Sequence, residues 1–286
     1  MPDKLTGKPV TKEIYAKIRS KIEDLKLTPK LVIIMIGEDP AAQYYVQNLE
    51  KRGLKIGIII ETKTYGTDIT QTEILNQIDD LNQDDSVHGI MIQKPLPSHL
   101  DESEIVMKLS PEKDMDGFHP INMGNLILGK EGFLPSTPTA VLELLDFYNI
   151  ETSGKNIVII GRSNIVGKPL ANLLLRKNKT GNATVTVCHS KTENLSEITR
   201  KADILIAAIG KAFFVTADMI KSDSIVIDVG VNQIDDPEKG HRYVGDVDYE
   251  NCFHKVSAIT PVPGGIGTIT TAVLLRNVLS AAQKAN

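Results

Sequence analysis

The sequence predicts an α/β protein of two domains, each with a mostly parallel sheet flanked by helices. Two observations predict this fold class. Segments of strand-like and helix-like periodicity alternate along the whole chain, which favours parallel sheets covered by helices. The 286 residues, 41% of them hydrophobic, are also enough for one large or two ordinary domains.

The chain begins with a predicted helix, a buried strand and a second helix. In the first helix, apolar residues recur at helical spacing: Val10, Ile14, Ile18, Ile22 and Leu25. The apolar run from Leu31 to Ile36 ends at Gly37 and predicts a strand. A helix follows from about Ala41 to Ile56.

Two more strands, Gly57–Ile60 and Val87–Gln93, flank a helix predicted at about Thr70–Leu81. The segment Lys94–Pro97 then breaks the pattern as a loop at the carboxyl end of a strand. Ligands bind at such ends in open parallel sheets, so this loop is a candidate binding segment.

After a polar region rich in glycine and proline (110–138), the alternation restarts with a helix at about Thr139–Tyr148. Four strands are then predicted: Asn156–Ile160, Ala183–Val187, Ile204–Ala208 and Ile225–Val229. The last helix, about Ile269–Lys284, is apolar on one face, and we expect it to cross back onto the first domain. The predicted domains are residues 1–138 with 269–286, and residues 139–268.

The segment 157–173 has the geometry of a dinucleotide site, because an apolar strand leads through a glycine turn into a helix. Gly161 leaves room for a pyrophosphate, and Gly167 lets the helix pack closely on the strand. A helix start near Ile165 offers N–H groups to an anion. The spacing lacks the usual middle glycine, so the generic fingerprint is weak. The second domain is therefore predicted to be a Rossmann-type NAD(P)-binding domain.

The second Rossmann strand is followed by residues that favour NADP. NAD enzymes place a carboxylate near this strand end for the ribose hydroxyls, whereas here no carboxylate follows Val187 before Glu193. Arg162 and Ser163, with Ser190, could donate hydrogen bonds to a 2′-phosphate. The alternative for Arg162 is a solvated turn residue, and NAD remains possible as the cofactor.

Composition excludes several classes of function. The net charge is −4, and the basic residues are scattered, so neither nucleic acid nor a membrane surface is an expected partner. The chain has two cysteines without CxxC spacing, no histidine cluster and no leader pattern before Leu5. We expect a cytoplasmic, reduced protein without a metal.

Six motifs in family order resemble methylenetetrahydrofolate dehydrogenase/cyclohydrolase over essentially the whole chain. They are AAQYYV (41–46), KDMDGFHP (113–120), GRSNIVGKPLANLL (161–174), IDVGVN (227–232), GDVDY (245–249) and PVPGGIGT (261–268). The resemblance implies a folate/catalytic domain built from the N-terminal part and the final helix, an NAD(P)-binding domain, a folate cleft between them and a homodimer. It also implies oxidation of methylenetetrahydrofolate by NADP, followed by hydrolysis of the methenyl product.

The resemblance assigns Tyr45, Gln93 and Asp116 as catalytic residues, with Asp116 binding the pterin. It also places a lysine four residues after the tyrosine, on the same helical face. Here Leu49 stands at that position, and Lys51 lies roughly 120° away around the helix. Leucine carries no proton. The alternative for Asp116 is a turn-forming Asp-Gly pair.

The resemblance extends the folate site to further residues, and adds Val231 to the cofactor site beside the nicotinamide. The substrate-binding residues it implies are Tyr45, Leu49, Ile92, Gln93, Lys94, Asp116, Pro263, Gly264, Gly265, Ile266 and Gly267. Lys94, Ser136, Ala140 and Thr268-Ile269 depart from the usual pattern. Lys94 could be a relocated proton carrier, although adjacent residues of an extended segment face opposite ways, which favours solvent.

The sequence thus predicts hydride transfer from 5,10-methylenetetrahydrofolate to NADP, with weak or absent cyclohydrolase activity because of Leu49. Two alternatives are a fully bifunctional enzyme and a non-catalytic nucleotide-binding paralogue. A short-chain dehydrogenase is disfavoured, because no Tyr-x-x-x-Lys follows the Rossmann motif.

Overall fold

A computed structural model describes residues 2–237 and 240–285. The chain divides into two compact units. The six-stranded unit comprises Met1–Lys12 and Thr137–Thr270, and the three-stranded unit comprises Glu13–Ser136 and Thr271–Asn286. Each unit has a parallel α/β sheet, so the predicted fold class is confirmed.

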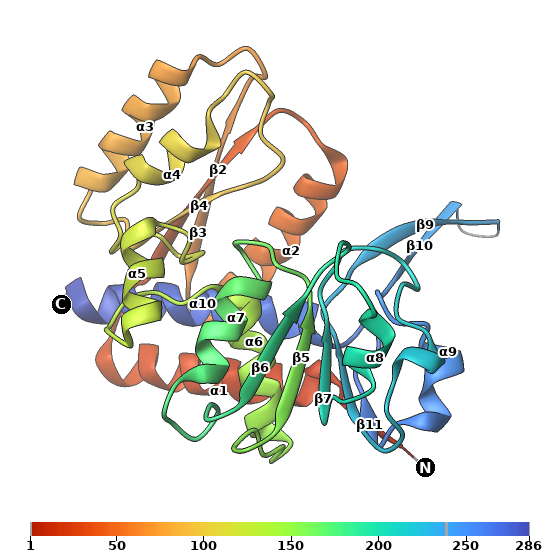
Figure 1. Cartoon of the computed structure of the whole chain (residues 1–286). Helices are drawn as coiled ribbons and strands as arrows, with labels where there is room; N and C mark the ends of the chain where they lie inside the picture. Colours follow the sequence, from red (N-terminus) through yellow and green to blue (C-terminus); the bar gives the residue numbers. More distant parts are fainter. Residues whose placement is uncertain (1, 238–239, 286) are drawn as a thin grey trace. The chain divides into compact units, whose positions relative to one another are not determined.

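The three-stranded unit has the strand order β3-β2-β4, with all pairs parallel. Its strands are β2 (Lys30–Ile36), β3 (Ile59–Tyr65) and β4 (Gly89–Ile92). Its helices are α2 (Pro40–Ile56), α3 (Gln71–Gln83), α4 (Glu102–Lys108), α5 (Pro120–Leu128) and most of α1 (Gly7–Leu25) and α10 (Ile266–Ala285), whose first residues belong to the other unit. Apolar side chains of α3 and α4 form one buried cluster with β2 and β4, and α2 lies on the other side of the sheet (Figure 1).

Helix α2 has well-defined ends. The Asp39 side chain accepts a hydrogen bond from the Ala42 N–H, and Pro40 occupies the first turn. Gly57 ends the helix in the left-handed conformation, with φ +85°. The predicted strand Gly57–Ile60 is therefore wrong in its bounds, because Gly57 caps the helix and β3 begins only at Ile59.

The six-stranded sheet has the order β1-β11-β8-β7-β5-β6, with all pairs parallel. Its strands are β1 (Asp3–Lys4), β5 (Asn156–Ile160), β6 (Thr184–Cys188), β7 (Ile204–Ala207), β8 (Ile225–Asp228) and β11 (Ala258–Ile259). Because β1 pairs with β11, residues 2–12 lie in this unit, whereas the predicted domain boundary groups them with the other domain.

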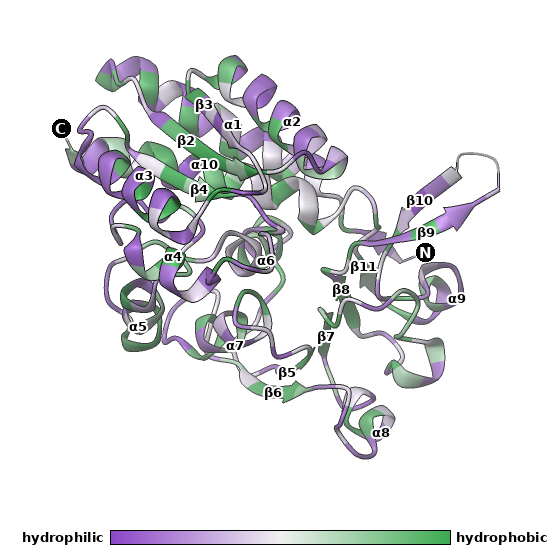
Figure 2. Cartoon of the chain, turned by 90° about the horizontal axis from the view of Figure 1, so that it is seen from above, coloured by the Kyte–Doolittle hydropathy of each residue, from purple (hydrophilic) through white to green (hydrophobic). Residues whose placement is uncertain are grey.

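Short helices and a hairpin complete the six-stranded unit. The helices are α6 (Ser136–Phe147), α7 (Gly167–Leu175), α8 (Leu195–Thr199), α9 (Tyr249–Cys252), η1 (Ala217–Met219) and η2 (Phe253–Lys255). Strands β9 (Asn232–Asp236) and β10 (Gly240–Val244) pair antiparallel in a hairpin that projects from this unit and is largely hydrophilic (Figure 2).

Several elements escaped the sequence analysis. Helix α5 lies within the region 110–138, which was expected to be irregular, and β1, α4, β11 and the hairpin were not predicted. No helix among residues 2–237 and 240–285 is long and apolar enough to span a membrane.

Candidate functional site

The predicted cofactor residues lie on loops that leave one edge of the six-stranded sheet. Strands β5, β6 and β8 run in the same direction, so the loops after them emerge at the same carboxyl edge. The Gly161 N–H donates to the Cys188 carbonyl at 2.8 Å, which ties two of these loops together. Arg162, Ser163 and Ser190 are exposed there. The loop after β8 carries Val231, which is 59% exposed.

The two glycines of the turn are required by close backbone packing. A Cβ on Gly161 would lie 2.1 Å from the Ala208 carbonyl oxygen, and φ there is +138°. A Cβ on Gly167 would lie 2.0 Å from the Gly161 carbonyl oxygen. Neither position therefore tolerates a side chain, and the helix start is held against the end of the strand.

Helix α7 starts at Gly167, so the predicted start near Ile165 is two residues early. Ile165 lies in the exposed turn before the helix. The Ser163 hydroxyl accepts from the N–H groups of Val166 at 3.1 Å and Gly167 at 3.5 Å. Its own hydrogen is still available for donation to an anion.

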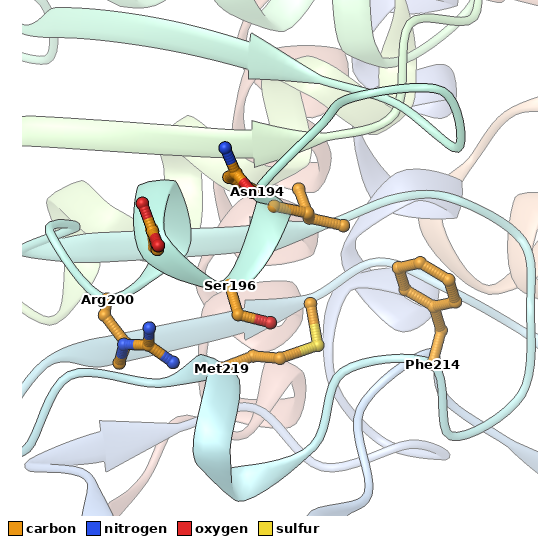
Figure 3. A pocket seen from close by; sticks show the side chains of 7 residues that line it. Asn194, Ser196, Arg200, Phe214 and Met219 are labelled. Carbon is orange, nitrogen blue, oxygen red and sulfur yellow. The ribbon is translucent and has the colours of Figure 1, made fainter.

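A pocket of about 460 Å³ lies in the six-stranded unit, between α8 and the segment that carries Phe214 and Met219 (Figure 3). Its lining comprises Asn194, Leu195, Ser196, Glu197, Arg200, Phe214 and Met219. The Arg200 guanidinium donates to the Asp218 carbonyl at 3.0 Å. The mixture of apolar and polar walls suits a flat heterocycle with polar edges.

In the three-stranded unit, Tyr45 lies on α2 and is 37% exposed. Burial raises the pKa of its hydroxyl to about 12, the charge of Asp116 adds to this rise, and a hydrogen bond with Thr271 opposes it. These interactions place Tyr45 near both Asp116 and α10. The pKa keeps this phenol protonated at neutral pH.

Leu49, one turn after Tyr45, is 1% exposed and belongs to the buried face of α2. No side chain at this position donates or accepts a proton. The tyrosine therefore has an aliphatic neighbour at the position where the resemblance expects a lysine.

Gln93 and Lys94 follow β4 directly. The Gln93 amide donates to the Lys94 carbonyl at 2.7 Å. The Lys94 ammonium bonds the Glu102 carboxylate at 2.5 Å and lies 5.2 Å from the centre of the Phe118 ring. With its side chain 37% exposed, Lys94 is engaged by an acid and an aromatic ring rather than free in solvent. Ile92 is buried at the end of the strand.

Asp114 and Asp116 have different environments in one loop. The buried Asp114 carboxylate accepts from the Gly117 N–H at 3.1 Å, the His119 N–H at 2.8 Å and the Asn122 amide at 3.0 Å. Asp114 thereby holds the loop in shape. Burial raises the pKa of Asp116 to about 7, the charge of Asp114 adds to the rise, and Lys94 opposes it. Asp116 therefore titrates near neutral pH.

The glycine-rich segment Pro263–Gly267 belongs to the six-stranded unit. Gly264 has φ +105°, and its carbonyl accepts from the Gly7 N–H at 2.8 Å. Gly265 and Ile266 are buried, whereas Pro263 and Gly267 are exposed. The structure thus groups Tyr45, Gln93, Lys94 and Asp116 in one unit and holds this segment in the other.

Three residues of interest were missed. Thr271 bonds Tyr45 from α10, and Asp228 and Asp246 are buried behind the carboxyl edge of the six-stranded sheet. The aspartates stand in the motifs IDVGVN and GDVDY, which the sequence analysis quoted without assigning them a role. Thr271 carries no sequence signal, because its partner lies more than two hundred residues away in the chain.

Comparison with known proteins identifies the family. A model described as tetrahydrofolate dehydrogenase/cyclohydrolase, NAD(P)-binding domain, matches residues 135–286. A model described as the catalytic domain of the same family matches residues 5–116.

Relatives cover nearly the whole chain. The Bifunctional protein FolD of Chlorobium chlorochromatii is 50% identical over 290 residues, covering 99% of this chain and 98% of the relative. Among solved structures, bifunctional FolD from Campylobacter jejuni matches with a TM-score of 0.94 and 45% sequence identity. FolD from Trypanosoma brucei, solved with NADP and an inhibitor, matches with a TM-score of 0.93 and 34% sequence identity. Each comparison covers 99% of both chains. The chain belongs to the tetrahydrofolate dehydrogenase/cyclohydrolase family.

Proposed function

We propose that this protein is an NADP-dependent methylenetetrahydrofolate dehydrogenase whose methenyltetrahydrofolate cyclohydrolase activity is weak or absent. The observation that carries the proposal is the environment of Tyr45 on α2. Its phenol is near Asp116 and bonded to Thr271, while Leu49, one turn further on, is buried and aliphatic. The proposed folate site thus contains Tyr45 and Asp116, which would orient the substrate, and has no lysine one turn after Tyr45.

The carboxyl edge of the six-stranded sheet supports NADP as the cofactor. The two glycines leave space where a pyrophosphate would approach. Arg162, Ser163 and Ser190 would hold the 2′-phosphate through charge-assisted hydrogen bonds. The pocket beside Phe214 and Met219 would take the adenine ring. When bound, NADP supplies the acceptor for a hydride.

In the proposed reaction, Asp116 binds the amino and ring N–H groups of the pterin, and Tyr45 and Gln93 orient the one-carbon bridge. The adjacent folate nitrogens drive departure of the hydride from the methylene carbon. This step chiefly needs the reacting groups held at near contact, so it proceeds without a titrating lysine.

Hydrolysis of the methenyl bridge, unlike hydride transfer, needs acid–base catalysis. Water must be activated and a ring nitrogen protonated, and a positioned acid or base accelerates such steps by ~10²–10⁴-fold. Leu49 provides neither group. Lys94 bonds Glu102, and this pairing opposes a role for Lys94 as a substitute proton carrier.

The test is a pair of assays on the purified protein. NADP and NAD reduction is followed with methylenetetrahydrofolate, and decay of methenyltetrahydrofolate is followed separately. We expect turnover with NADP and much slower hydrolysis. Hydrolysis at a rate comparable to dehydrogenation would overturn the restricted activity, and no reduction of either nucleotide would overturn the dehydrogenase itself.

The second candidate is the fully bifunctional enzyme. The relative from Chlorobium chlorochromatii, at 50% identity, carries the name Bifunctional protein FolD, which favours it. In that case a bound water would carry the proton.

We further propose that the protein is a homodimer. Light scattering on the purified protein would test this proposal by measuring its molecular mass.

A further inference from the structure

A buried pair of carboxylates joins three loops at the carboxyl edge of the six-stranded sheet. Asp246 is 0% exposed and Asp228 is 3% exposed. One Asp246 oxygen accepts from the backbone N–H groups of Ile209 at 2.7 Å and Gly210 at 2.9 Å. The other accepts from the Lys211 N–H at 2.8 Å and the Asn232 amide at 2.9 Å. The loop after β7 is thereby tied to the start of the hairpin.

Asp228, the last residue of β8, completes the arrangement. Its carboxylate accepts from the N–H groups of Gly230 at 3.0 Å, Asp246 at 3.0 Å and Val247 at 2.9 Å. The partners of both carboxyl groups are neutral N–H donors. Burial and the Asp246 charge raise the pKa of Asp228 to about 7, and the backbone N–H groups that bond it oppose this rise. Among the described residues, no cation is recorded with either carboxylate.

The backbone packs tightly against the carboxyl groups of Asp228 and Asp246. A Cβ on Gly230 would lie 2.2 Å from the Asp246 carboxylate, and one on Gly245 would lie 1.9 Å from an Asp228 oxygen. Side chains at these positions would displace the acids. The loop from Gly230 to Asn232 is therefore fixed at both ends, while Val231 between them remains exposed.

We propose that Asp246 is a positioning residue that acts through Asn232 and the loop 209–211 to fix Val231 for the nicotinamide end of the nucleotide. The inference rests on the proposed dehydrogenase function. Hydride transfer is sensitive to small displacements, and a misplacement of about 1 Å can slow a reaction by about 10²-fold. Loosening this loop should slow the chemical step more than it weakens nucleotide binding, because the phosphate contacts lie on other loops.

The test uses Asn232→Ala, which removes one bond to Asp246 and leaves both buried carboxyl groups in place. The matched control is Gln233→Ala, an exposed amide at the next position. We expect Asn232→Ala to lower kcat about tenfold, with the KM for NADP and the Kd for NADPH, measured by fluorescence, within about twofold of wild type. The primary isotope effect with substrate deuterated at the methylene carbon should rise. Gln233→Ala should match wild type in all four measurements.

Asp246→Asn should lower kcat further, by about 10²-fold, and should speed amide hydrogen exchange in 209–211 without nucleotide. A kcat for Asn232→Ala equal to that of Gln233→Ala, or a fall without a rise in the isotope effect, would overturn the inference. Wild-type protein that reduces no nucleotide with the folate substrate would defeat the proposed function and this inference with it. If wild type turns over normally and Asn232→Ala has the same kcat as Gln233→Ala, the inference fails while the proposed function stands.

Discussion

Leu49 and Tyr45 lie on successive turns of α2 in different surroundings. Leu49 is 1% exposed, whereas the Tyr45 side chain is 37% exposed with its hydroxyl bonded to Thr271. At the scale of single residues, the proposed restriction to one activity rests on this packed aliphatic side chain. A leucine at position 49 packs in the core, whereas a lysine there could transfer a proton.

Leu49→Lys should increase methenyl hydrolysis by ~10²-fold, because it adds a proton carrier one turn from Tyr45. It should also lower the free energy of unfolding by roughly 2–4 kcal/mol, since an ammonium replaces a buried apolar group. Leu49→Met is the control, because it keeps the volume and adds no proton. Urea unfolding and the two assays measure both effects. Equal hydrolysis by the lysine and methionine variants would contradict the prediction.

The carboxyl of Asp116 should make stability depend on pH. Its pKa is raised from 3.8 to about 7 by burial, then by Asp114, so the folded state binds a proton that the unfolded state releases above about pH 4. Its contribution to stability is present below pH 4 and is lost as the pH rises through 7. Between pH 5 and pH 8, wild type should lose roughly 1–3 kcal/mol more stability than Asp116→Asn. Urea unfolding at the two pH values checks this, and parallel losses would refute it.

At the scale of elements, periodicity predicted the long buried segments well. Helices α1, α2, α3, α6 and α10 and strands β2, β5, β6, β7 and β8 all lie where apolar spacing placed them, within a few residues. Apart from β6, in which only Cys188 is buried, these segments bury one face or both, so their apolar residues recur at a regular spacing. Elements with little buried surface left no such signal: β1 has two exposed residues, and the hairpin strands are mostly exposed.

The candidate site was predictable only in part for the same reason. Motifs identify residues near one another in the chain, such as Gly161 and Arg162. They do not reveal partners brought together by folding, such as Thr271 for Tyr45 or Asn232 for Asp246. Burial of Leu49 follows from its place on the apolar face of α2 with Val46 and Ile56, but the spacing does not say which residues of other elements cover that face.

The junction of β5 and α7 should tolerate no side chain at Gly161. Gly161→Ala would place a methyl group 2.1 Å from a carbonyl oxygen at φ +138°, so we expect a loss of roughly 3 kcal/mol or more and no NADP binding. Gly124→Ala is the control within helix α5, where a Cβ meets no atom within 4 Å, and should stabilise by about 0.5–1 kcal/mol. Thermal unfolding and NADPH fluorescence measure both. If Gly161→Ala still bound NADPH, the prediction that this position tolerates no side chain would be wrong.

At the scale of the whole molecule, the predicted cofactor residues all lie in the six-stranded unit, whereas the predicted folate residues lie in both units: Tyr45, Gln93 and Asp116 in the three-stranded one, and 263–267 in the six-stranded one. Ligands should therefore protect different segments from hydrogen exchange. Saturating NADP should slow exchange mainly in 137–262, and a folate analogue should slow it in 30–136 and 263–271. At about 100 times Kd, each ligand should add about 2.7 kcal/mol to the stability of the protein. Uniform protection of the whole chain by NADP alone would contradict the assignment.

The two-residue strand β1 closes one edge of the six-stranded sheet by pairing with Ala258 and Ile259. Open strand edges recruit other chains, and short pairing segments blunt them. We therefore expect Asp3 and Lys4 to limit association of other chains at this edge of the sheet. Removing residues 3–4 would expose one edge of β11, which would still pair with β8 on its other side, so the truncated protein would be prone to associate with copies of itself even with every site residue in place.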